Sequence, residues 1–426
     1  MKATYSVHES YKPSGYDWVG DVPAHWAVEK LGTSLRAVSE KNRPDLPLLS
    51  ITREKGVIER DLDDEESNHN FIPDDLSGYK VLRAGQFGMN KMKAWQGSYG
   101  VSQHTGIVSP AYFIFDFTKE IDPDFFNRAI RSKLYVSFFG SASDGVRIGQ
   151  WDLNKSRMRE IPLLVPPLPE QRAIAAFLDD KCAKIDGAVK IKEDQIALLR
   201  ERRQIIIQDA VTRGLNPAAP MKDSGIDWIG QIPAHWEVKP CRYAFRSVRR
   251  SDRHGSEIKL SVTQKRGIVP TDEMEENSNQ AKDFDGFQIC HPNDLVLNKY
   301  KAHLGVFWMT PMRGIITNNY TVFRPLNGIV SKYFEMLFHT DPYIAIFRNT
   351  VYGVTEGMAP LYTGDFYRLP AICPPEEEQL GILRHIAELS AKFESAISIK
   401  EAQIAALEEY KTSLINAAVT GKIKVI

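Results

Sequence analysis

The stretch "SGYDWVGDVPAHWAV" at residues 14–28 returns as "SGIDWIGQIPAHWEV" at residues 224–238. Ten of the fifteen positions are identical, although 210 residues separate the two copies. Each copy carries two tryptophans and one histidine, and a match of this length is not expected by chance. The stretch, called the opening motif below, therefore predicts an internal duplication.

Further matching segments follow in the same order in both halves. Their offset stays between 208 and 211 residues, so the duplication covers nearly the whole chain. The residues between the matched segments agree in pattern but differ in identity, which predicts one scaffold carrying two different surfaces. The matched pairs are "LSITREKGVI" (49–58) with "LSVTQKRGIV" (260–269), "MNKMKA" (89–94) with "LNKYKA" (297–302), "GIVSPAYFIF" (106–115) with "GIITNNYTVF" (314–323), "IPLLVPPLPEQ" (161–171) with "LPAICPPEEEQ" (369–379), "IKEDQIALL" (191–199) with "IKEAQIAAL" (399–407), and "AVTRG" (210–214) with "AVTGK" (418–422).

Composition limits the class of protein. A chain of 426 residues exceeds one ordinary core, so we expect two or more domains. We expect no membrane helix and no signal peptide, because no run of 18 apolar residues occurs and the first residues lack an apolar segment. The four scattered cysteines favour reduced thiols and a cytoplasmic location. A formal net charge of zero argues against binding nucleic acid by charge alone.

The pattern of apolar residues and turn residues predicts an α+β fold. Short β-branched and aromatic runs between glycines and prolines alternate with a few helical stretches, and a long proline-free segment follows in each half. We expect two similar globular α/β domains and two long spacer helices that form an antiparallel coiled coil. The predicted segments are a first globular domain at residues 1–165, a first spacer helix at 166–213, a second globular domain at 214–373 and a second spacer helix at 374–426.

The long segments have the apolar spacing of a coiled coil. Between Pro169 and Thr212 there is no further proline and one glycine. Apolar residues recur at alternating intervals of four and three, which is the seam of a left-handed coiled coil. Two seam positions are basic in both copies. The seam positions are Leu178, Cys182, Ile185, Val189, Lys192, Ile196, Leu199, Arg203, Ile206 and Ala210 in the first copy, and Ile386, Ser390, Phe393, Ile397, Lys400, Ile404, Leu407, Lys411, Leu414 and Ala418 in the second.

The chain order predicts how the two helices pair. The first helix ends where the second globular domain begins, and the second helix begins where that domain ends. Because domain termini usually lie close together, the helices should run antiparallel with an approximate two-fold symmetry. In the symmetric register Lys192 faces Ile404 and Ile196 faces Lys400. A lysine in a seam lowers stability but fixes register.

Two similar domains held apart by a pair of helices suggest a device that measures a distance. DNA is a natural object to measure, since equivalent major-groove faces recur every turn, roughly 34 Å. Two fused and diverged domains would read a bipartite sequence that is not palindromic. Each domain would read one half, and the helices would set the gap.

At this point the chain resembles the specificity subunits of type I restriction–modification systems. The resemblance rests on "DWVGDVPAHW" and "DWIGQIPAHW", on "PPLPEQRAIAAFLD" and "PPEEEQLGILRHI", and on "AVTRG" and "AVTGK", and it spans the full length. It implies that the globular domains are target-recognition domains for double-stranded DNA and that the subunit has no chemistry of its own. It also implies two adenine-methylating modification subunits as partners, with two ATP-driven restriction subunits in the full complex. S-adenosylmethionine, ATP and Mg²⁺ are then expected on those partners and none on this chain.

Candidate DNA-contacting residues are polar or basic side chains in glycine-flanked segments. Asn90-Lys91 and Asn298-Lys299 occur in both domains, so phosphate or scaffold roles suit them better than sequence discrimination. Gln103 and His104 against Asn318 and Asn319 differ, and are better candidates for specificity. The first-domain candidates are Arg53, Lys55, Asn90, Lys91, Lys93, Gln96, Ser98, Tyr99, Gln103, His104, Arg147 and Gln150; the second-domain candidates are Gln264, Lys265, Arg266, Asn298, Lys299, Lys301, His303, Asn318, Asn319, Tyr352 and Thr355.

The opening motif resembles a chemical site at first sight, through Trp18, His25 and Trp26 and their repeats Trp228, His235 and Trp236. No triad partner is evident, and the spacing suits no common metal motif. Because both halves carry the motif, we interpret it as a scaffold that docks the chain entry of each domain against the helices. The alternative is a surface for the modification subunit. We predict no catalytic residue and no metal ligand.

Two rival functions stay open. An enzyme acting on DNA is the first, but "VPPLPE" places Val165, and its repeat Cys373, where a methyltransferase motif needs an amide or acid. For a nuclease, Asp252 with Glu257-Ile258-Lys259 occurs once and lacks the usual preceding proline, and no Walker A loop is present. The second rival is a coiled-coil adaptor that binds only proteins.

Overall fold

The computed structural model describes residues 5–61, 73, 75–147, 150–251, 257–274, 286–351 and 360–426. These residues form two compact units. Unit 1 comprises Met1–Glu193 with Glu401–Ile426, and unit 2 comprises Asp194–Lys400. Each unit holds one globular part, called the first or second head, and a portion of both long helices. The four segment boundaries read from the sequence stay predictions.

The first head is built around the four-stranded antiparallel sheet β4-β11-β8-β9. Four antiparallel strand pairs surround it, β1–β2, β3–β14, β5–β6 and β7–β10, and a fifth pair, β12–β13, follows helix α3. Its elements are β1 (Tyr11–Pro13), β2 (Asp21–Pro23), β3 (Ala27–Lys30), α1 (Leu31–Ser34), β4 (Leu35–Val38), β5 (Leu49–Thr52), β6 (Gly56–Glu59), β7 (Lys80–Leu82), β8 (Phe87–Met89), the 3₁₀ helix η1 (Ala94–Gln96), β9 (Tyr99–Val101), β10 (Gly106–Val108), β11 (Phe113–Phe117), α2 (Pro123–Ile130), α3 (Lys133–Ser141), β12 (Ser143–Arg147), β13 (Gln150–Leu153), α4 (Lys155–Arg159) and β14 (Pro162–Val165).

The second head repeats the central sheet and the four strand pairs around it, and the described residues show no counterpart of the pair β12–β13. Its four-stranded sheet is β18-β25-β22-β23, and the pairs β15–β16, β17–β26, β19–β20 and β21–β24 match the four pairs around the first sheet. Its elements are β15 (Met221–Asp223), β16 (Gln231–Pro233), β17 (Glu237–Pro240), η2 (Cys241–Tyr243), β18 (Phe245–Val248), β19 (Leu260–Val262), β20 (Ile268–Pro270), η3 (Thr271–Glu273), β21 (Gln288–Cys290), β22 (Leu295–Asn298), η4 (Lys299–Leu304), β23 (Phe307–Met309), β24 (Gly314–Ile316), β25 (Tyr320–Pro325), α6 (Ser331–Phe338), α7 (Asp341–Thr350), α8 (Thr363–Arg368) and β26 (Pro370–Cys373). The predicted α+β fold with two similar domains is confirmed.

Apolar residues at equivalent positions fill both head cores. Tyr135 in α3 and Tyr343 in α7 are fully buried, and each hydroxyl meets the backbone N–H of the last strand of its head, at Leu164 and Ile372. The core of each head continues into the long helices, with Leu178 belonging to the first and residues of both helices to the second. Each head is therefore packed onto its helix pair rather than linked to it by a free hinge.

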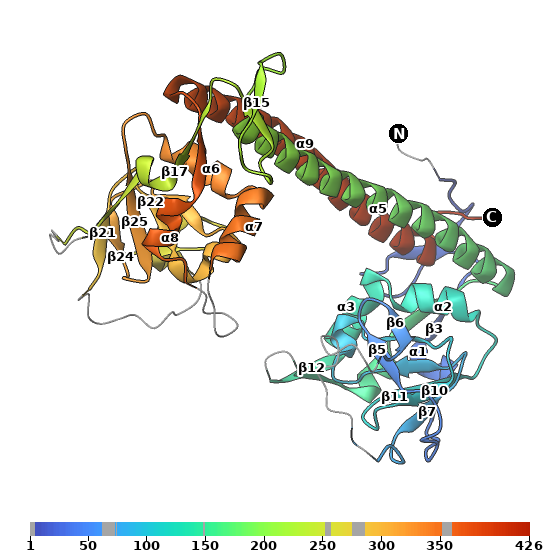
Figure 1. Cartoon of the computed structure of the whole chain (residues 1–426). Helices are drawn as coiled ribbons and strands as arrows, with labels where there is room; N and C mark the ends of the chain where they lie inside the picture. The colour runs from blue at the N-terminus through green and yellow to red at the C-terminus, as the bar shows by residue number, and fades with distance from the viewer. Residues whose placement is uncertain are drawn as a thin grey trace. The chain divides into compact units, whose positions relative to one another are not determined.

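The two long helices are α5 (Leu168–Arg213) and α9 (Glu376–Val419) (Figure 1). Within each unit their portions pair antiparallel. All twenty seam positions read from the sequence are buried or half-buried. In the middle of α5, away from the heads, off-seam apolar residues are instead exposed, with Leu198 at 62% and Ile205 at 52%. The coiled-coil seam is thus confirmed by the burial pattern.

Polar contacts fix the register in each unit. In unit 1 the Lys192 ammonium donates to Oε1 of Gln403 at 2.7 Å, and the Lys411 ammonium lies 2.6 Å from Asp186. In unit 2, Arg203 lies 3.5 Å from Glu394. Gln403 is the neighbour of Ile404, the partner predicted for Lys192. The basic seam residues therefore reach polar groups at the edge of the partner helix while their methylenes cover the seam.

The opening motif closes the junction between helices and head. In unit 1, Trp26 is fully buried, and a Cβ on Gly421 would collide with Pro23 and lie 3.2 Å from the Trp26 ring. Gly421 has φ +69° and follows the end of α9. Such a left-handed residue normally ends a helix, and glycine adopts it without strain. The start of α5 reaches the same motif through Glu170, whose Oε2 lies 2.8 Å from Nε2 of His25.

Unit 2 repeats the junction with the helix roles exchanged. Gly214, at φ +76°, ends α5, and a Cβ there would lie 3.1 Å from the ring of Trp236. Glu378 in the first turn of α9 accepts from Nε1 of Trp236 at 2.7 Å and lies 2.5 Å from Nε2 of His235. In both units, the motif therefore joins the start of one long helix to the end of the other. The scaffold interpretation of the motif is confirmed.

A glutamine next to each of these glutamates makes a second link. Gln171 donates to the carbonyl of Pro166 and accepts from the N–H of Asp122, the residue that caps α2. Gln379 makes the matching pair of contacts, with Pro374 and Val330. Both side chains are buried, so the repeated "EQ" of the helix openers is explained by docking.

Two further sequence expectations concern the whole chain. Within the described ranges, no helix is both long and apolar enough to cross a bilayer. All four cysteines are buried and free of disulfide bonds, as predicted.

Removing the carboxylate of Glu378 should destabilise the second junction. In Glu378→Ala the buried indole N–H of Trp236 loses its acceptor, which should lower the free energy of unfolding by about 1–3 kcal/mol. Urea denaturation followed by far-UV circular dichroism measures the change. Glu377→Ala is the matched control, since this exposed residue lies in the same helical turn and should change stability by less than about 0.5 kcal/mol. Equal effects of the two substitutions would contradict the junction model.

Candidate nucleic-acid interface

The turn between β5 and β6 presents basic residues on the first head. Arg53 and Lys55 are exposed there, and the N–H of Lys55 donates to Oγ1 of Thr52 at 3.1 Å. Beneath the turn, Nη2 of Arg131 donates to the carbonyls of Arg53 (2.9 Å) and Glu54 (2.7 Å). Burial lowers the pKa of Arg131, but a guanidinium stays charged at neutral pH. The turn is thus held in one position with its basic side chains free to contact a ligand.

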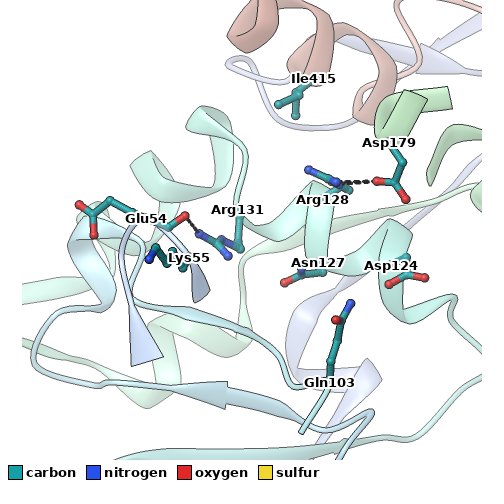
Figure 2. A pocket seen from close by; sticks show the side chains of 9 residues that line it. All are labelled: Glu54, Lys55, Gln103, Asp124, Asn127, Arg128, Arg131, Asp179 and Ile415. Atoms are coloured by element: carbon teal, nitrogen blue, oxygen red, sulfur yellow. Dashed lines mark hydrogen bonds and ion pairs between the residues drawn. The ribbon is translucent and has the colours of Figure 1, made fainter. Parts of the chain in front are cut away.

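A pocket of about 420 Å³ opens beside this turn. Figure 2 shows Lys55 beside Arg131, and Gln103 pointing toward α2. Arg128 is paired with Asp179 of α5, with Nε 3.0 Å from the carboxylate. Because charges of both signs line the pocket, it suits hydrogen bonding to polar groups better than simple binding of phosphate. Its lining residues are Glu54, Lys55, Gln103, Asp124, Asn127, Arg128, Arg131, Asp179 and Ile415.

The second head has the same turn on a different support. Gln264, Lys265 and Arg266 are exposed between β19 and β20, and the N–H of Arg266 donates to Oγ1 of Thr263 at 2.9 Å. A Cβ on the neighbouring Gly267 would lie 3.4 Å from the Trp308 ring. That ring packs against His339, with ring centroids 4.4 Å apart.

The support beneath the two turns therefore differs in chemistry. The first turn rests on the half-buried guanidinium of Arg131 and the second on an indole–imidazole pair. Burial lowers the pKa of His339 to about 4, so the imidazole is neutral near pH 7. The β-hairpin is common to both heads, while the side chains on and beneath it are specific to each.

The repeated Asn-Lys pairs have mainly structural contacts. Asn90 and Asn298 are buried, and each side-chain oxygen accepts from a backbone N–H two residues later, at 3.1 and 3.2 Å. Lys91 lies 3.2 Å from Asp152, and the Lys299 ammonium donates to the carbonyl of Asn318 at 2.9 Å. These contacts support the scaffold role for both asparagines, and a phosphate contact by the Asn-Lys pairs stays a prediction.

Two further candidates lie in the core of the first head. Ser98 is 2% exposed and Tyr99 is fully buried, with its ring 4.4 Å from that of Phe139. Neither side chain can reach a nucleic acid without unfolding of β9, so both predictions are wrong. The repeat carried the missed signal, because the second copy has Phe307 at the position of Tyr99, and an apolar equivalent indicates an inward-facing strand position.

The remaining candidates are distributed over both heads. Lys93, Gln103, Lys301, Asn318 and Asn319 are exposed, whereas Gln96, His104 and His303 are half-buried. Nδ1 of His104 lies 3.3 Å from Glu59. Arg147 ends β12 and Gln150 begins β13, and their side chains are outside the described part of the structure. Tyr352 and Thr355 lie outside the described residues. DNA contact for all these residues stays a prediction.

The structure brings together two small groups of candidates and adds residues that the sequence did not indicate. Lys55 and Gln103 border the same pocket, and Lys299 contacts Asn318. Arg131 and His339 were missed because each follows a short helix without a glycine or a repeat match beside it. Their importance comes from the turn that packs over them, which only the folded chain shows.

Curated proteins similar in sequence to this chain are specificity subunits of type I restriction enzymes. No family model matches the chain. The type I restriction enzyme MjaX specificity subunit of Methanocaldococcus jannaschii is 20% identical over 234 residues, which is 52% of this chain and 52% of that protein. The MjaVIII specificity subunit of the same organism is 32% identical over 106 residues, 25% of this chain and 23% of that protein. The matched region thus spans about half the length of the first curated relative and a quarter of the second.

Solved structures match over a longer range. A chain from a study of assembly and conformational transition in the type I R-M system has a TM-score of 0.65 at 12% identity, covering 94% of this chain and 99% of that one. The HsdS subunit from Thermoanaerobacter tengcongensis has a TM-score of 0.53 at 14% identity, covering 94% and 98%. The resemblance to type I restriction–modification specificity subunits is confirmed. The specificity-subunit fold extends over both heads and both long helices, while the side chains on the turns are those of this chain.

Acidification should weaken unit 2 through His339. Its pKa is about 4 in the folded protein and 6.5 when unfolded, so the unfolded chain binds the proton more readily between these values. The stabilisation is fully present above pH 6.5 and is lost as the pH falls toward 4. Between pH 7 and pH 5 the free energy of unfolding should drop by about 2 kcal/mol from this residue alone.

Urea denaturation at both pH values measures this drop. His339→Gln removes the titrating group, so the variant should lose about 2 kcal/mol less than the wild type on acidification. Identical pH dependence in the two proteins would show that His339 does not contribute.

Proposed function

We propose that this chain is the DNA-recognition subunit of a type I restriction–modification complex. Each head reads one half of a bipartite, asymmetric DNA site, and the helix pair sets the gap between the halves. The observation that carries the proposal is the contrast between the heads. Their central sheets and the four strand pairs around them match, whereas the exposed turn residues differ, with Arg53 and Lys55 in one and Gln264, Lys265 and Arg266 in the other.

The two heads share one fold but carry different side chains on their exposed turns. This difference is expected if each head recognises a different DNA half-site. Bases in the major groove are distinguished by the pattern of donors and acceptors, so a change of side chain on a fixed turn changes the preferred base. An enzyme duplicated in the same way would be expected to keep its reacting residues identical in both copies. The residues kept here, in the opening motif and the helix openers, hold the heads to the helices.

The helix pair supports the spacer role. The seam is continuous in the burial pattern of α5 and α9, and Lys192, Arg203 and Lys411 fix the pairing from both units. A coiled coil with a fixed register has a fixed length, which is the property that a spacer needs.

The proposed partners are two modification subunits and, in the full complex, two restriction subunits. Leu198 and Ile205 are seven residues apart and hence lie on one face of α5, where both are more than half exposed. Such an apolar row suits docking of a partner helix. In this proposal the chain itself is not catalytic, and S-adenosylmethionine, ATP and Mg²⁺ belong to the partner subunits.

A coiled-coil adaptor that binds only proteins remains the second candidate function. The exposed apolar residues Leu198 and Ile205 of α5 would suit protein binding by such an adaptor equally well. The nuclease alternative has no further support, since Asp252 lies outside the described residues and Glu257 contacts Arg313 at 3.3 Å.

Selection from a pool of random duplexes tests the function. The purified chain, alone and with modification subunits co-expressed from its host, should retain duplexes that share two different half-site sequences. The number of base pairs between the two half-sites should be constant. Replacing Lys55 and Gln103 by alanine should alter the selected sequence of one half-site only. Lys265→Ala with Arg266→Ala should alter only the sequence of the other half-site. Each lost base contact should weaken binding about 5- to 150-fold, the equivalent of roughly 1–3 kcal/mol.

Lys119→Ala serves as the control, because Lys119 is exposed on the first head, pairs with Glu29 and is not among the candidates. Lys119→Ala should leave both selected half-site sequences unchanged. Retention of duplexes without any sequence preference would favour a coiled-coil adaptor that binds only proteins. If variants of both heads alter the same half-site, the proposal that each head reads its own half-site is rejected.

Shortening the helix pair should shorten the gap. Residues 191–197 and 399–405 face each other in the observed register, as Lys192 and Gln403 show. Deleting both segments removes one heptad from each helix, roughly 10 Å or two to three base pairs, and should preserve the seam. The same duplex selection should recover the two original half-site sequences with fewer base pairs between them. A changed half-site sequence would count against the spacer role of the helix pair.

A further inference from the structure

Three side chains of unit 1 meet at the helix–head junction. His8 precedes β1, His25 belongs to the opening motif, and Glu170 lies in the first turn of α5. One potential ligand atom from each lies within 4.8 Å of the other two. His8 and Glu170 are buried, while His25 is about half exposed. The three residues are widely spaced along the chain, so no local pattern in the sequence indicates this group.

The buried histidine has an unpaired ring nitrogen. Nε2 of His8 is inaccessible to solvent and has no hydrogen-bond partner among the described residues, and it lies 3.7 Å from Oε1 of Glu170. The ring also lies against the backbone of Ile423. In a neutral ring with its proton on Nδ1, Nε2 carries a lone pair. A buried lone pair facing a carboxylate is unfavourable unless a cation lies between them.

A neutral imidazole nitrogen with a lone pair is the donor that metal ions bind in histidine, so a metal ion between His8 and Glu170 would satisfy both groups.

The second head provides an internal comparison. There Glu378 uses both carboxylate oxygens within the junction, one toward His235 and one for the indole N–H of Trp236. The position of His8, three residues before the first strand, is occupied by Ala218. In the first head the indole N–H of Trp26 has no partner among the described residues. The carboxylate is thus directed away from the tryptophan only where the second histidine is present.

We propose that His8, His25 and Glu170 bind a divalent transition-metal ion of the zinc type. Two imidazole nitrogens and a carboxylate are a known donor set for zinc, with bonds of roughly 2.0–2.2 Å. The three ligand atoms already lie within 4.8 Å of one another, so binding at these distances would require only a rearrangement of side chains, and water would complete the coordination on the side of the half-exposed His25. Harder ions such as Mg²⁺ prefer all-oxygen ligands and fit this set poorly.

The bound ion would tie together the segments that meet at this junction. It would join the chain before β1, the opening motif and the start of α5. Only the first head would be stabilised in this way. The inference goes beyond DNA recognition and does not depend on it.

Zinc binding by the metal-stripped full chain tests the proposal. Isothermal titration with ZnCl₂ at pH 7.5 should show one site per chain that is clearly tighter than binding to scattered surface histidines. Zinc should also raise the melting temperature, and EDTA should reverse the shift, because an ion that binds only the folded state stabilises it. His8→Ala and Glu170→Gln should each weaken binding at least about tenfold.

His235→Ala is the matched control, since it removes the equivalent histidine from the junction that has Ala218 in place of a second one. It should leave the zinc affinity unchanged. Co²⁺ in place of Zn²⁺ should give visible d–d absorption in the wild type and in His235→Ala, and lose it in His8→Ala. Circular dichroism of each variant shows whether it is folded. Zinc binding that is absent, or equally strong in wild type and folded His8→Ala, would overturn the proposal.

Discussion

The packing of one buried tryptophan at each helix–head junction is the constraint on which this structure depends. Trp26 lies where α5 begins and α9 ends, and Trp236 lies where α9 begins and α5 ends. A motif that contacts the start of one helix and the end of the other brings these two ends side by side, as in an antiparallel helix pair. The opening motif is therefore repeated because each unit needs the same junction.

This junction leaves the exposed face of each head free to diverge. The β5–β6 turn and the β19–β20 turn have the same backbone contacts, but Arg131 supports the first and Trp308 with His339 the second. Substitution in such a turn changes its chemistry without disturbing the sheet or the helix pair. A scaffold of this kind suits a protein in which recognition must change while assembly stays constant.

The helix pair combines apolar packing with a few polar contacts. Apolar seam residues supply the burial, and Lys192 and Lys411 place their charges on Gln403 and Asp186 at the edge. Apolar packing alone would tolerate a shift by one heptad, whereas these contacts would be lost in a shifted register. The basic seam positions are thus best understood as devices for register, which explains why both copies have them.

The sequence by itself determined the duplication, the two long helices, their seam and the α+β class, because repeats and apolar periodicity are local properties that survive in a string of residues. It also indicated that Asn90 and Asn298 have shared roles. It misplaced Ser98 and Tyr99, since a polar segment beside glycines does not show which side chains face inward. Only the tertiary structure decided that Arg131 and His339 lie beneath the β5–β6 and β19–β20 turns, and that His8, His25 and Glu170 meet at one point. These groups are assembled from distant segments, and their contacts depend on packing geometry that no local pattern records.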